Sequence, residues 1–137
     1  MKKLILLVVF TLPLMAQAQP PEGQDWWACQ SVQNAGLIYQ SGDWESVYFS
    51  DELKFVLIAD GSSLTTESVY KAGITTKAEC RANPFTLGTV SCTDISGGHL
   101  FFDKRLGRGA ISHIYGGAMD GDVRDTLSVT PFECAKG

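Results

Sequence analysis

The chain has 137 residues, of which 45% are hydrophobic and 19% are charged, a balance typical of a globular domain with one core. It contains 11 Lys and Arg against 15 Asp and Glu, so its net charge is −4. An acidic chain with scattered Lys and Arg lacks the electrostatic footprint of a nucleic-acid-binding protein, and anionic lipid head groups would repel it. We therefore expect no nucleic acid as a partner, and the charge favours a basic protein instead.

The start of the chain has the pattern of a cleavable signal peptide. Residues 2–3 are lysines, residues 4–15 form an apolar run, and residues 16–18 read Ala-Gln-Ala, the small-x-small pattern of a cleavage site. A membrane span needs about 20 apolar residues, and this run is shorter and is interrupted by Pro13. We expect a signal peptide over residues 1–18, no membrane span, and a periplasmic or secreted product.

The remainder, from residue 19 onward, is more acidic than the whole chain. Removal of the two leader lysines leaves nine basic and 15 acidic residues, which gives a net charge of −6. Residues 19–24 form a polar lead-in with Pro and Gly, which we expect to be flexible. Residues 25–137 are then expected to form a single disulfide-linked β domain.

All four cysteines, Cys29, Cys80, Cys92 and Cys134, lie in this mature part. An even count in an exported chain of this size indicates two disulfide bonds. Zinc sites use close pairs such as C-x-x-C, which the chain lacks, so we expect no metal and no cofactor. We favour Cys29–Cys134, which ties the first ordered segment to the last strand, and Cys80–Cys92, which closes a hairpin-like segment. The crossed pairings stay open at this stage.

The periodicity of the apolar residues predicts a mainly β fold. Residues 26–35 allow either a short helix around Cys29 or a strand followed by a turn. After Gly36 the pattern becomes that of strands, with turn signals about every 8 to 12 residues, which favours a small antiparallel meander in the form of a barrel or a sandwich. The predicted strands are 37–39, 44–49, 54–59, 64–70, 85–93, 100–102, 110–115 and 126–134.

Three details of these strands can be tested. The polar spacer at 40–43 predicts a hairpin loop between its flanking strands. The continuous apolar run at 54–59 predicts a strand buried on both faces, whereas the Ser- and Thr-rich stretch at 64–70 predicts a half-exposed strand. Pro131 predicts a bulge or an edge position within the last strand.

Aromatic residues crowd the first third of the mature chain. Rings of this kind build the cores of small β domains, and they also bind apolar ligands, sugars and peptides. Adjacent Trp26 and Trp27 are hard to bury together in a thin domain, because strand neighbours point to opposite faces. The candidate binding residues are Trp27, Tyr39, Trp44, His113 and Tyr115.

Catalytic and metal motifs are weak in comparison. Ser112 and His113 are neighbours in a predicted strand, so their side chains point apart and cannot form a catalytic pair. The acidic loop at 120–125 lacks the closing ligand of a calcium-binding loop, because Pro131 occupies that place. The glycine loops at 107–109 and 116–117 do not lead into a helix, as phosphate-binding loops do. We expect no catalytic residue.

The chain resembles two groups of exported proteins. The arrangement Trp27-x-Cys29, Gly36-Leu37-x-Tyr39, Gly42-x-Trp44 and Phe49, with Leu127-x-Val129 and Phe132-x-Cys134 at the end, is similar to small exported disulfide-containing β proteins of Gram-negative bacteria with no assigned function. A second, weaker resemblance is to periplasmic lysozyme inhibitors, small disulfide-bearing β-barrels in which a Ser-Gly-x-x-Tyr loop enters the lysozyme cleft. Residues 112–117 read Ser-His-Ile-Tyr-Gly-Gly, with Ser and Tyr at another spacing, so no residue role is carried over.

These features predict a non-catalytic exported module that binds or inhibits a protein partner in the envelope or outside the cell. A carrier of small apolar ligands, with an aromatic-lined barrel, is the alternative. A small hydrolase that uses His99 or His113 is a third hypothesis, and it requires a Ser or a carboxylate within hydrogen-bond reach of one imidazole in a cleft.

Overall fold

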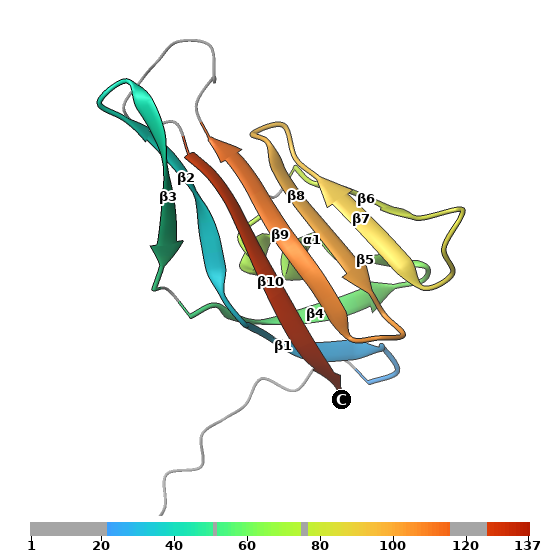
Figure 1. The fold of residues 1–137 in the computed structure, drawn as a ribbon. Coiled ribbons are helices and arrows are strands. Elements are labelled where there is room, and N and C mark those ends of the chain that lie inside the picture. Colours follow the sequence, from blue (N-terminus) through green and yellow to red (C-terminus); the bar gives the residue numbers. More distant parts are fainter. Residues whose placement is uncertain (1–21, 51, 75–76, 116–125) are drawn as a thin grey trace, which may run out of the picture.

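A computed structural model describes residues 22–50, 52–74, 77–115 and 126–137. The predicted signal peptide and the acidic loop at 120–125 lie outside the described residues, as does the first half of the predicted lead-in. The described residues form ten strands and one short helix (Figure 1). The elements are β1 (Trp26–Ser31), β2 (Asn34–Gln40), β3 (Asp43–Phe49), β4 (Lys54–Asp60), β5 (Ser63–Leu64), α1 (Thr66–Lys71), β6 (Glu79–Ala82), β7 (Thr89–Thr93), β8 (Gly98–Asp103), β9 (Arg108–Tyr115) and β10 (Thr126–Lys136).

The strands form one antiparallel sheet that curls into a nearly closed barrel. Neighbouring strands follow the order β5-β4-β1-β10-β9-β8-β7-β6, and β2 branches from β10 and carries β3 (Figure 1). The mainly β antiparallel fold is therefore confirmed, in its barrel form. The helix considered around Cys29 is not formed, because that segment is β1, hydrogen-bonded to β4 on one side and to β10 on the other.

The long strand β10 joins the two parts of the sheet. On one side it pairs with β9 in one unbroken register, which includes the pair Pro131 and Ala110, so no bulge interrupts this side and Pro131 is not on an edge strand. On its other side, residues 126–129 pair with β2 and residues 132–136 pair with β1. The carbonyl oxygen of Pro131 accepts the N–H of Val32 at 2.9 Å between these two partners. The N and C=O of one strand residue point to the same side, so the backbone nitrogen of Pro131 also points to the gap between β1 and β2. No ladder bond is formed there, so the lack of an N–H on Pro131 costs none.

The helix α1 lies against the concave side of the sheet (Figure 1). The half-exposed strand predicted at 64–70 is therefore wrong over most of its length. The Oγ1 of Thr65 accepts the N–H of Ser68 at 3.4 Å and so caps the helix, which is a local role that Thr and Ser residues favour. The helix and the residues after it contribute three fully buried side chains to the core: Val69, Ala72 and Ile74.

The interior is filled by side chains. The rings of Trp27 and Phe102 meet edge to face with their centroids 5.3 Å apart, and those of Phe55 and Phe132 do so at 5.1 Å. A Cβ at Gly109 would lie 2.3 Å from the ring of Phe132, so only glycine allows this ring to rest against β9. The buried apolar residues are Trp27, Cys29, Phe55, Leu57, Leu64, Val69, Ala72, Ile74, Val90, Cys92, Leu100, Phe102, Ile111 and Phe132.

Both predicted disulfides are present, and each joins residues that lie directly opposite one another. Cys29–Cys134 links β1 to β10, and Cys80–Cys92 links β6 to β7. All four cysteines are paired, which indicates that the folded chain exists in an oxidising environment. Within the described ranges, no helix is long and apolar enough to cross a membrane.

Two strand predictions need correction. The run at 54–59 forms β4, but only one of its faces is buried: Phe55 and Leu57 point inward, whereas Val56 is 39% exposed. The strand predicted at 85–93 begins only at Thr89. Before it, the Oδ1 of Asn83 accepts the N–H of Phe85 at 2.9 Å, which favours a turn over a strand.

Candidate binding face

The hairpin predicted from the spacer at 40–43 is formed by β2 and β3, but its loop has only two residues, because Gln40 and Asp43 already pair as strand residues. Ser41 and Gly42 have φ values of 55° and 89°, the positive angles of a type I′ turn, whose twist matches that of the flanking strands. At the tip, the Nε2 of Gln40 donates to the Oε2 of Glu45 at 2.6 Å. The turn therefore sets the register of the hairpin.

Close approach of β2 to β10 fixes the position of this hairpin on the barrel. A Cβ at Gly36 would lie 2.0 Å from the carbonyl oxygen of Leu127, so a larger residue would push the strands apart. Gly36 pairs with Ser128 on β10 and with Val47 on β3. The branch of the sheet thus depends on one residue that has no side chain.

The register aligns apolar side chains from four strands on one side of the sheet. Val129 lies opposite Ala35, which lies opposite Tyr48, and directly opposed residues share a face. The next row pairs Ile114 with Leu127 and Leu127 with Leu37. We call this surface the outer face; its residues are Ala35, Leu37, Tyr39, Trp44, Tyr48, Ile114, Leu127 and Val129.

Much of the outer face is open to solvent. Tyr48 is 77% exposed, Ile114 is 55% exposed and Val129 is 50% exposed. Thr130, the polar neighbour of Val129, is only 7% exposed, so this part of β10 turns its apolar side outward. Apolar patches of this kind mark sites of interaction on folded proteins.

The predicted residues Tyr39 and Trp44 meet on this face. They are directly opposed across the hairpin, and their rings form an edge-to-face pair with centroids 5.4 Å apart. Both are partly exposed. Such rings offer a rigid apolar surface with a polar edge, which suits contact with a protein.

The other predicted binding residues lie elsewhere. Trp27 is in the core and only 3% exposed, because its position in β1 points inward; its neighbour Trp26 is half-buried. His113 points to the opposite side of β9 from Ile114, with its Nε2 3.1 Å from the carbonyl oxygen of Gly73. Tyr115 ends β9, where its backbone pairs with Thr126.

Sequence reasoning missed most of the outer face. The alternation of Leu127 and Val129 predicts that they share a face, but it does not say which face is buried. The residues Ala35, Leu37, Tyr48 and Ile114 join them only through pairing between distant strands. Their proximity has no local signal in the sequence.

The segment that contains the hairpin carries only negative charges. Residues 19–53 contain no Lys or Arg, whereas six acidic residues fall in this segment. Asp43 and Glu45 are exposed on β3 itself. The first cation after the hairpin is Lys54, whose Nζ lies 3.3 Å from the Oε1 of Glu52.

A Ser–His contact lies on another part of the sheet. The Oγ of Ser91 is 2.7 Å from the Nε2 of His99, which meets one requirement of the hydrolase hypothesis. The residues opposite His99 in the sheet are Thr93 and Ser112, which carry hydroxyls rather than the carboxylate that would orient an imidazole. Among the described residues, no group of His, Cys, Asp and Glu could hold a metal ion.

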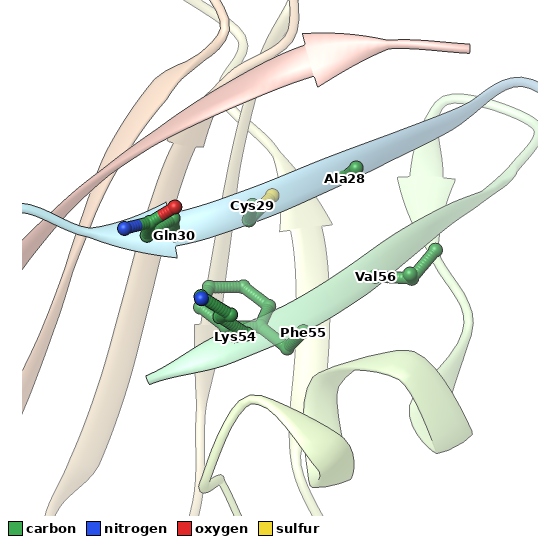
Figure 2. Close-up of a pocket in the computed structure, with 6 residues that line it drawn as sticks. All are labelled: Ala28, Cys29, Gln30, Lys54, Phe55 and Val56. Carbon is green, nitrogen blue, oxygen red and sulfur yellow. The ribbon is translucent and has the colours of Figure 1, made fainter. Parts of the chain in front are cut away.

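A shallow depression of about 390 Å³ crosses β1 and β4 (Figure 2). Gln30 and Lys54 lie at one end, and Ala28 and Val56 lie toward the other (Figure 2). The polar end is already satisfied, because Gln30 donates to Glu52 and Lys54 pairs with the same carboxylate. The depression therefore lacks the convergent free polar groups of a small-molecule site.

Comparison with known proteins gives no match: no protein-family model, no curated protein and no solved structure is similar to the chain. The two resemblances drawn from the sequence therefore remain predictions. Ser112 and Tyr115, whose order prompted the second resemblance, belong to strand β9 rather than to a loop. The function has to be argued from the surfaces of this chain.

Proposed function

We propose that the chain is a non-catalytic exported module that binds a basic protein partner through the outer face, and that inhibits the partner where that partner is an enzyme. The observation that carries the proposal is the contiguous exposure of Ile114, Val129 and Tyr48 across strands far apart in the sequence. Monomeric proteins seldom leave such a surface open unless it has a partner.

The negative charge of the hairpin defines the chemistry of the partner. The aromatic pair Tyr39–Trp44 lies on a hairpin that carries Asp43 and Glu45 and no Lys or Arg. An apolar patch beside a field of one sign attracts a partner of the opposite sign and repels one of the same sign. A basic exported protein therefore fits this face better than an acidic one.

The other two functions find less support. A carrier needs an internal cavity, whereas Trp27, Phe102 and Phe132 pack ring against ring inside the barrel and α1 adds further side chains. A hydrolase needs a cleft beside the Ser91–His99 contact, whereas the depression described above lies on β1 and β4. We propose a periplasmic or secreted location, because the two disulfides require oxidation and the predicted signal peptide would direct export.

The test is a titration of residues 19–137 against purified exported proteins of opposite charge. Lysozyme serves as the first basic probe, and an acidic protein of similar size serves as the counterpart. We expect saturable binding of a basic protein that weakens between about 50 mM and about 300 mM salt. Replacement Tyr48→Ala should weaken that binding about tenfold, because it removes an exposed ring from the contact.

Phe85→Ala is the matched control, since Phe85 is 94% exposed but lies in the turn before β7. It should leave binding unchanged. The proposal is wrong if acidic and basic proteins bind equally, if no basic protein of the panel binds, or if the two variants lose affinity to the same degree.

A further inference from the structure

Among the described strands, β3 ends its branch of the sheet and has one open edge. In the described part of the chain it pairs with β2 alone, along seven residues that include no Lys, Arg or Pro. The edge strands elsewhere are shorter: β6 has four residues and carries the ion pair Arg81–Glu79, and β5 has two. Proteins usually block a long edge with Lys, other charged residues, Pro or a bulge. Of these, β3 has only the carboxylates Asp43 and Glu45, which would repel an acidic strand but attract a basic one.

The turn shows which backbone groups face the open edge. A type I′ turn is closed by a bond from the N–H of Asp43 to the carbonyl of Gln40, so the backbone of Asp43 faces β2. Because direction alternates along a strand, the N–H and C=O groups of Trp44, Ser46 and Tyr48 face outward. The N–H of Trp44 indeed donates to the Oδ1 of its neighbour Asp43, at 2.8 Å, and not to a strand.

The side chains along this edge are sorted by face. Trp44 and Tyr48 lie on the outer face, and Glu45 lies on the opposite one with Asp43. An added strand would therefore meet aromatic rings on one side and carboxylates on the other. Its own side chains would have to alternate in the same way, apolar toward the rings and basic toward the carboxylates.

We propose that the basic partner contributes an extended segment that pairs antiparallel with β3 and continues the sheet. The inference rests on the proposed function and names its mode of contact. Main-chain bonds to the carbonyl oxygen of Trp44 and to the N–H and C=O groups of Ser46 and Tyr48 supply affinity, and the alternating side chains supply selectivity. Antiparallel pairing is the arrangement of every strand pair in this sheet.

The probe is a synthetic peptide of about eight residues that alternates Val and Lys, a length typical of a strand. In antiparallel pairing, a Val placed opposite Trp44 or Tyr48 on the outer face directs its own N–H toward β3. N-methylation of the Val residues should therefore abolish binding to the protein, whereas N-methylation of the Lys residues should leave it within about twofold. A peptide of alternating Val and Glu should bind at least about tenfold more weakly.

The protein side is tested with Ser46→Pro and its matched control Ser46→Ala. Both remove the hydroxyl, but only proline removes the outward N–H and adds a ring at the edge, and an edge strand tolerates proline there. Circular dichroism and the melting temperature check that both variants keep the fold. We expect Ser46→Pro to abolish peptide binding and Ser46→Ala to preserve it.

Three results would overturn strand addition. The first is equal loss of binding from both N-methylated peptides. The second is a basic partner that binds Ser46→Pro as well as the parent chain while Tyr48→Ala weakens it; that result would leave the proposed function standing. The third is concentration-dependent dimerisation of the parent chain, measured by sedimentation and lost in Ser46→Pro, which would assign the edge to a second copy.

Discussion

Asp103 organises the turn between β8 and β9 with a single carboxylate. Its Oδ1 accepts the N–H groups of Arg105 at 2.9 Å and Leu106 at 3.2 Å, and its Oδ2 lies 3.3 Å from the guanidinium of Arg105. The side-chain hydrogen bond from Arg105 is the main reason that the pKa of Asp103 lies below its usual value, with the backbone bonds adding to it. The carboxyl is thus held in its charged form.

The sign of the pH effect follows from that lowered pKa. The folded chain holds the proton on Asp103 less tightly than the unfolded chain, so this group stabilises the fold fully above its ordinary pKa. The contribution is lost as the pH falls through the lower, folded-state pKa. We expect Asp103→Asn to reduce the free energy of unfolding by about 1–3 kcal/mol at pH 7, by weakening these bonds.

Urea unfolding of the parent chain and of Asp103→Asn at pH 7 and in acid checks this prediction. The difference between the two proteins should shrink in acid, where the parent carboxyl also becomes neutral. Glu67 is a suitable comparison, because the pKa of this exposed carboxyl is lowered by Lys71 outside any turn. A difference for Asp103→Asn that stays constant with pH would contradict the argument.

At the scale of elements, β3 should show two classes of backbone amide. The N–H groups of Glu45 and Val47 face β2, whereas those of Ser46 and Tyr48 face the open edge. In the free protein, Ser46 and Tyr48 should exchange hydrogen at least about tenfold faster than Glu45 and Val47. Amide exchange followed by NMR measures this directly, and uniform exchange along β3 would mean that its outward groups are already paired.

The contrast between the hairpin β2–β3 and the helix α1 shows how far local sequence determines an element. The loop of Ser41 and Gly42 lies between two apolar segments, and its turn chemistry is local, so the hairpin could be predicted. The helix has six residues, and it begins at the N-cap Thr65 in a stretch rich in Ser and Thr, residues that also suit a strand. Its identity depends on burial of Val69 against the sheet, which is a tertiary contact.

Prediction of the binding face met a different limit. An alternating strand such as β10 has two faces, and hydrophobicity would bury Val129 in preference to Thr130. In the structure Thr130 is buried and Val129 is exposed, because Thr130 lies on the same inward face of β10 as the buried Phe132. Tyr39 and Trp44 could be proposed because they are close in sequence, whereas Ile114 reaches them only through the order of the strands.

At the scale of the whole molecule, the two disulfides should contribute unequally to stability. Cys29–Cys134 spans 105 residues of sequence, and Cys80–Cys92 spans 12. Restriction of the unfolded chain increases with loop length, so the first bridge should stabilise the fold by about 4–5 kcal/mol and the second by about 3 kcal/mol. The order of the cysteines along the chain favours this pairing but leaves the crossed pairings open, and it gives no signal that each bridge lies directly across two strands.

Denaturant unfolding of the paired variants Cys29→Ala with Cys134→Ala and Cys80→Ala with Cys92→Ala tests this ranking. Mild reduction of the parent chain, followed by alkylation, provides a control that leaves the sequence intact. The first variant should unfold at the lower denaturant concentration. The opposite order would show that packing around Cys92, which is fully buried, outweighs the restriction of the long loop.

The two ends of the described fold lie beside one another, because the N–H of Gly137 donates to the carbonyl oxygen of Trp26 at 3.1 Å. The hairpin β2–β3 joins the other half of β10, at the far end of the barrel (Figure 1). A tag, bead or fused domain attached at residue 137 would therefore stand away from Trp44 and Tyr48. Immobilisation through residue 137 would therefore leave the hairpin on the side away from the support, where a partner in solution can reach it.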